Sequence, residues 1–72
     1  MEPHQQRVVD ENKELNEKID KLYIFMHTDK FKSLDKEEID RLRNQFSVMN
    51  LYSQILEQRI SAFISYEKNI SK

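Results

Sequence analysis

The absence of glycine constrains how this chain can fold more than any other feature of its sequence. The 72 residues contain no glycine, and the only proline is Pro3. Glycine and proline are the residues that most often interrupt helices, so a chain without them can stay helical over long stretches. The longest such stretch predicts one helix from 35 to 70, about 50 Å long at ~1.5 Å per residue.

The start of this long helix carries its own signals. Asp35 is a favoured N-cap residue, and Glu38 follows three residues later, which is the spacing of a capping box. Leu34 and Ile39 flank the cap at the spacing of a hydrophobic staple. These residues predict where the helix begins.

Two apolar stripes run along the predicted long helix. The first has steps of three and four, typical of a helix packed on another helix, and skips Ser53. The second lies one residue out of step. Together they are wider than one partner helix can cover, which favours contact with a second copy over a helix that is simply well buried. The first contains Ile39, Leu42, Phe46, Met49, Leu56, Ile60, Phe63 and Ile70, and the second Val48, Tyr52, Ile55, Ala62 and Tyr66.

A shorter helix is predicted from about 4 to 26, followed by a connection over 27–34. Within the connection, Thr28 is placed to cap a single helical turn that tucks Phe31 under the end of the hairpin. Asn12 is the only polar member of the helix's seam, where it either fixes the register or oligomeric state or lies at a solvated end. The seam contains Val8, Asn12, Leu15, Ile19, Leu22 and Met26.

These elements predict an all-α fold, an antiparallel helical hairpin formed by a single domain over 1–72. The first helix should end near Ile60 of the second, so the end of the second helix would overhang without a partner in the monomer. An exposed apolar end of this kind favours a homo-oligomeric helical bundle, with a dimer as the smallest symmetric solution. The residues expected at the oligomer interface are Asn12, Ile60, Phe63, Ile64, Tyr66 and Ile70.

The composition excludes several kinds of chemistry. Without cysteine the chain has no disulfide and no thiol nucleophile, and without glycine it has no phosphate-binding loop. His4 and His27 lie at opposite ends of the first helix and cannot share a metal ion within one chain. The net charge of −1 makes a nucleic-acid partner unfavourable. We expect a non-enzyme without catalytic residues, metal or cofactor, and the lack of a signal peptide or membrane span favours the cytoplasm.

One group of polar residues is a candidate binding site. Gln45, Tyr52 and Arg59 are spaced seven apart on the long helix, and Arg7 and Glu11 should lie toward the same end as Tyr52. Tyrosine can stack on a base, and arginine can hold a phosphate or carboxylate with two hydrogen bonds. The group could line a ligand pocket between subunits or anchor a protein partner. The alternative is a polar network that fixes the packing of the helices, with Glu11 paired to Arg59 or Arg7 and Tyr52 hydrogen-bonded at the rim.

The sequence also resembles a family of short phage and prophage proteins related to an open reading frame of a crAss-like phage. The resemblance covers 4–63, and the family has no assigned activity, so no residue roles carry over. In the first helix it is carried by His4, Gln5, Gln6, Arg7, Val8, Val9, Asp10, Glu11, Glu14, Leu15, Lys18, Ile19, Lys21 and Leu22. In the rest it is carried by Phe31, Leu34, Gln45, Met49, Tyr52, Ile55, Leu56, Arg59 and Ile60.

The resemblance implies a small accessory protein of a tailed phage, made in the cytoplasm of a bacterial host. Proteins of this size and origin often counter antiviral defence. The first hypothesis is therefore that the chain binds and inhibits a bacterial defence protein. The second is an oligomeric sponge that sequesters a cyclic nucleotide immune signal. The third is a structural helical bundle that assembles only with itself.

Overall fold

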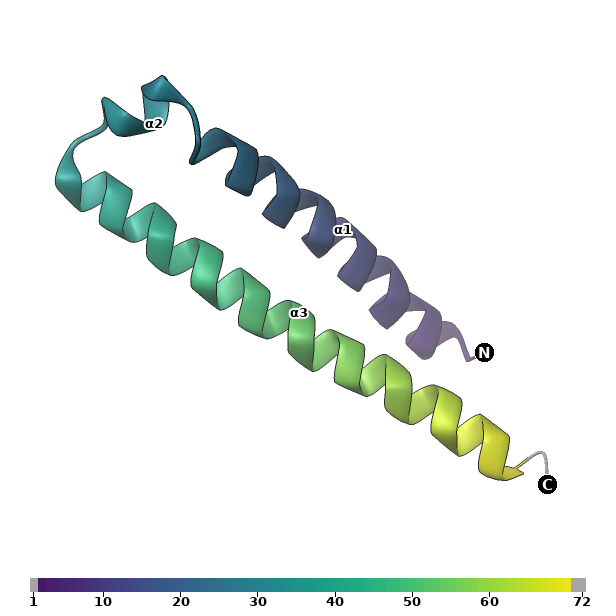
Figure 1. Ribbon diagram of the computed structural model, residues 1–72. Helices are drawn as coiled ribbons and strands as arrows, with labels where there is room; N and C mark the ends of the chain where they lie inside the picture. The colour runs from purple at the N-terminus through teal and green to yellow at the C-terminus, as the bar shows by residue number, and fades with distance from the viewer. Residues whose placement is uncertain (1, 71–72) are drawn as a thin grey trace.

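The computed structural model describes the backbone of residues 2–70 and the side chains of residues 2–65. Three helices follow one another: α1 (Pro3–Phe25), α2 (Asp29–Lys32) and α3 (Lys36–Ile70). Figure 1 shows α1 lying antiparallel beside α3, with α2 at the tip where the chain reverses. The described part contains no strand and forms a rod of 57 × 16 × 15 Å. The predicted all-helical class is confirmed, and assembly into an oligomer stays a prediction.

The start of α1 is held by bonds within its first turn. Pro3 occupies the first helical position, where its missing N–H is not needed. The Glu2 backbone N–H donates to Gln5 Oε1 over 2.9 Å, and the Gln5 side chain is buried. This side-chain bond keeps the first turn helical beside α3.

The tip of the hairpin reverses the chain without glycine. Met26 ends α1 in an ordinary right-handed conformation (φ −65°), and none of the described residues has a positive φ. Thr28 Oγ1 then accepts the Phe31 N–H over 3.2 Å and donates to the Phe25 carbonyl over 2.6 Å. Phe31 is buried, with its ring edge-on to that of Phe25 at 5.9 Å between centroids. The predicted Thr28 cap is confirmed.

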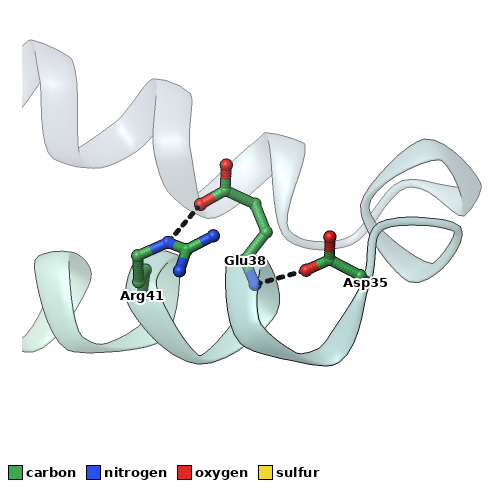
Figure 2. Close-up of polar contacts among 3 residues, drawn as sticks. All are labelled: Asp35, Glu38 and Arg41. Atoms are coloured by element: carbon green, nitrogen blue, oxygen red, sulfur yellow. Dashed lines mark hydrogen bonds and ion pairs between the residues drawn. The ribbon is translucent and has the colours of Figure 1, made fainter.

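The start of α3 carries half of the predicted capping box. Asp35 Oδ1 accepts the Glu38 backbone N–H over 2.8 Å, so the N-cap is confirmed (Figure 2). The Glu38 carboxylate does not reach back to the cap; it accepts from Arg41 Nε over 3.1 Å instead. The guanidinium one turn along is a charged donor, and a charge-assisted hydrogen bond is stronger than one to a neutral backbone N–H.

Apolar side chains fill the seam between α1 and α3, and a polar layer crosses its middle. Leu56 is fully buried, and Val8 and Ile19 are nearly so. Ser53, which the sequence pattern skipped, is 6% exposed and donates to Asn16 Oδ1 over 2.7 Å. Its hydroxyl also lies 3.3 Å from Asn12 Oδ1. Asn12 therefore sits within the seam of one chain, and its placement at a solvated end is wrong.

At the open end of the hairpin, α1 packs against α3 further along the long helix than the sequence predicted. The His4 ring packs edge-on against the Phe63 ring, with 6.4 Å between centroids, and Phe63 is half-buried. The expectation that Phe63 has no partner in the monomer is wrong, because the capped first turn of α1 reaches it. Ile64 is 46% exposed, and the side chains of Tyr66 and Ile70 lie outside the described residues. Figure 1 shows α3 continuing past the start of α1.

Candidate functional site

A hydrogen bond between α1 and α3 marks the centre of the candidate site. The Tyr52 hydroxyl donates to the Glu11 carboxylate, although the two residues are 41 positions apart in the sequence. Each is followed directly by a member of the polar layer, Asn12 on α1 and Ser53 on α3. The pair therefore lies at the rim of that layer, where it is open to solvent. Glu11 was predicted toward the same end of the hairpin as Tyr52, and the structure places the two in direct contact.

Electrostatics favour the neutral form of the tyrosine. The hydrogen bond to Glu11 raises the pKa of Tyr52 above its ordinary value of 10.0, and loss of solvation and the Glu11 charge act in the same direction. The positive charge of Arg59 acts in the opposite direction on the pKa of Tyr52. Tyr52 is thus a hydrogen-bond donor at neutral pH, and the positive charge of Arg59 is close enough to affect its pKa.

The two arginines of the predicted site keep their charged groups available. Among the described side chains, the one ion pair joins Glu38 to Arg41, and none joins Glu11 to Arg7 or Arg59. The packing-network alternative is confirmed for Tyr52, which is hydrogen-bonded at the rim, and is wrong for Glu11, which pairs with neither arginine. Both guanidinium groups belong to exposed residues, so their donors can serve an anion that is not part of this chain.

Gln45 does not join the other predicted site residues. Its Nε2 lies 3.8 Å from Met49 Sδ, one turn further along the same helix. The structure therefore brings together Glu11 and Tyr52, places the Arg59 charge near them, and leaves Gln45 apart. Within the described part of the chain, no cluster of histidine, cysteine or acidic residues is arranged to hold a metal ion. None of the described helices combines the length and the apolar character needed to cross a membrane.

An exposed apolar strip borders Tyr52 and was only partly recognised in the sequence. Val48, Leu51 and Ile55 are 63%, 59% and 52% exposed, and they follow one another at steps of three and four. Ala62, also exposed, continues the line after seven residues. We call these four residues the outer strip. Leu51 belonged to neither predicted stripe, although its spacing from Val48 and Ile55 was a sufficient signal.

Comparison with known proteins places the chain in a family. The family model described as Sequestin matches residues 2–62, a range that includes Glu11, Tyr52 and both arginines of the site. No curated protein and no solved structure shows significant similarity to the chain. The match covers α1, the tip and α3 as far as residue 62. The chain belongs to the Sequestin family.

Proposed function

We propose that this protein is a sponge, which binds a cyclic nucleotide signal of bacterial antiviral immunity and withholds it from its receptor. The family name, Sequestin, supports sequestration over inhibition of an enzyme or receptor. A sponge needs tight binding and no catalysis. In this proposal the protein is a phage accessory protein that acts as an oligomer in the cytoplasm of the host.

The arrangement of Tyr52, Glu11 and Arg59 is the observation that carries the proposal. Tyr52 is 40% exposed and its hydroxyl is tied to Glu11, so the phenol ring is held in one orientation at the surface. A ring fixed in this way can stack on a nucleobase, an interaction worth about 1–3 kcal/mol per base. An arginine without a carboxylate partner can bind a phosphodiester, and Glu11 can accept from base N–H groups.

Calorimetric titration with a panel of cyclic mono- and dinucleotides tests the sponge. At one hundred times the dissociation constant, the cognate nucleotide should stabilise the fold by ~2.7 kcal/mol, which a thermal shift also detects. Arg59→Ala should lose most of the affinity, because it removes the phosphate-binding group. Arg43→Ala, which removes another exposed arginine of the same helix, should bind like the wild type.

The aromatic half of the site has its own variant. Tyr52→Phe keeps the ring but loses the bond to Glu11, so it should weaken binding less than Tyr52→Ala does. A wild-type protein that binds none of the cyclic nucleotides would rule out the sponge for those ligands. Equal losses in the Arg59 and Arg43 variants would place the ligand elsewhere on the surface.

Inhibition of a host defence protein is the second candidate function, and the outer strip is the observation that favours it. Exposed aliphatic side chains on one helix face are a common docking surface for a partner protein. Leu51→Glu should then abolish inhibition of the defence protein, because it places a charge in the middle of the strip. Loss of nucleotide affinity in the same variant would instead connect the strip to the nucleotide site.

A further inference from the structure

We infer that the nucleotide site is shared between two copies of the chain, which pair antiparallel through their α3 helices. In this pairing, Tyr52 and Glu11 of one copy face Arg59 of the partner subunit. The inference rests on the proposed function for the identity of the ligand. The pairing of the helices rests on the outer strip and can be tested without any ligand.

Within a single chain, the two halves of the site are carried by different turns of α3. Tyr52 and Arg59 are seven residues apart on a continuous helix, which places their backbones ~10.5 Å apart along its axis. The Glu11 bond holds the tyrosine across toward α1 rather than along α3 toward Arg59. The phenol of Tyr52 is therefore bound to α1, whereas the Arg59 guanidinium has no ion pair among the described side chains.

The outer strip is arranged to pair with a second copy of itself. Val48 and Ala62 lie seven residues before and after Ile55, at equivalent positions of a heptad repeat. A two-fold axis at Ile55 therefore places each Val48 beside Ala62 of the partner subunit and brings the two Ile55 side chains together. Interfaces with two-fold symmetry require this kind of self-complementarity.

The charges complement each other in the same arrangement. Tyr52 and Arg59 occupy equivalent heptad positions on one flank of the strip, and antiparallel helices place such flanks opposite each other. Reversing the second helix about Ile55 brings Arg59 of the partner subunit opposite Tyr52, beside the Glu11 carboxylate. Arg59 has no carboxylate partner among the described side chains, so this contact would supply one. The two-fold axis produces two such sites, each formed by Tyr52 and Glu11 of one copy and Arg59 of the partner subunit.

Disulfide trapping tests the pairing of the helices. The chain contains no cysteine, so one introduced cysteine is the only thiol present. Ile55→Cys places two thiols at the axis, and mild oxidation should convert most of the protein into a covalent dimer. Ser61→Cys is the control, because Ser61 is exposed about 120° around the helix from Ile55 and should cross-link poorly. Equal cross-linking of the two variants, or none at Ile55→Cys, would overturn the pairing.

Mixing two inactive variants tests whether the site is shared. Tyr52→Ala and Arg59→Ala change exposed residues, and circular dichroism checks that both remain folded. A mixed dimer contains one complete site and one site that lacks both groups. With random pairing of equal amounts, half of the dimers are mixed, so about one quarter of the wild-type sites return. A site confined to one chain would recover nothing on mixing.

The two experiments separate the inference from the function on which it rests. Efficient trapping at Ile55→Cys in a protein that binds no cyclic nucleotide would overturn the sponge and retain the pairing. Nucleotide binding by the wild type, without recovery in the mixture, would overturn the shared site and retain the sponge.

Discussion

Two rows of aliphatic side chains on α3 have the same character and opposite surroundings. Leu56 belongs to the row that faces α1 and has no exposed surface, whereas Leu51, five residues earlier, is 59% exposed on the outer strip. Both rows have the three- and four-residue steps of a packed helix. The difference teaches that spacing identifies a face able to pack, while the length and register of the partner helix decide which face is covered within the monomer.

The largest effect should come from truncating one leucine in each row. Leu56→Ala should lower the free energy of unfolding by about 2–5 kcal/mol, because it leaves a cavity in the seam. Leu51→Ala should cost less than about 1 kcal/mol at low protein concentration, where the strip faces solvent. Chemical denaturation of both variants measures the contrast. Similar losses at every concentration would mean that the outer strip is already covered in the isolated chain.

The polar layer offers a smaller and more specific change to the seam. Ser53→Ala should cost about 1 kcal/mol, since it removes the hydroxyl that donates to Asn16 and leaves the surrounding apolar contacts in place. Ser47→Ala, which changes an exposed serine on the same helix, is the control and should be close to neutral. Urea titrations of the two variants compare them directly. A Ser53→Ala protein as stable as the wild type would show that the layer adds nothing to the seam beyond packing.

The smallest effect should appear at the rim between the two rows, and only in alkali. The folded state raises the pKa of Tyr52 because the neutral phenol donates a hydrogen bond to the Glu11 carboxylate. A raised pKa means that folding favours the neutral phenol. The contribution of Tyr52 to the free energy of unfolding is therefore fully present below its unfolded-state pKa of about 10, and it is lost as the pH rises through its folded-state pKa. Tyr52→Phe should therefore flatten the alkaline fall in stability. Thermal melts of both proteins across that range measure it, and identical pH dependence would contradict the bond.

Local signals in the sequence were sufficient for the ends of the helices. Thr28 and Asp35 each cap a helix through a backbone N–H three residues later, so nothing distant in the chain is needed to predict them. The extent of α1 and its seam followed from periodicity in the same way. The antiparallel pairing of the two helices predicted that Glu11 lies toward the same end as Tyr52, but not that the two are hydrogen-bonded.

What the sequence could not supply was the register to within one turn. Ser53 was left out of the seam because its side chain is polar, and only the approach of Asn12 and Asn16 makes it a buried donor. Phe63 was predicted to overhang because the register was set to end the first helix near Ile60, whereas the His4 ring packs on Phe63. Both errors concern contacts between helices, which the pattern of a single helix does not contain.

The slender shape of the rod has a consequence for the lifetime of the protein in a cell. Four apolar side chains are buried in the described part of the chain, Val8, Ile19, Phe31 and Leu56, and a core of this size leaves little stability in reserve. Proteases degrade chains that open transiently, and ligands or partners that bind only the folded form suppress that opening. We therefore expect copies that hold neither a ligand nor a partner to be degraded fastest. The amount of protein that persists would then follow the amount of ligand present.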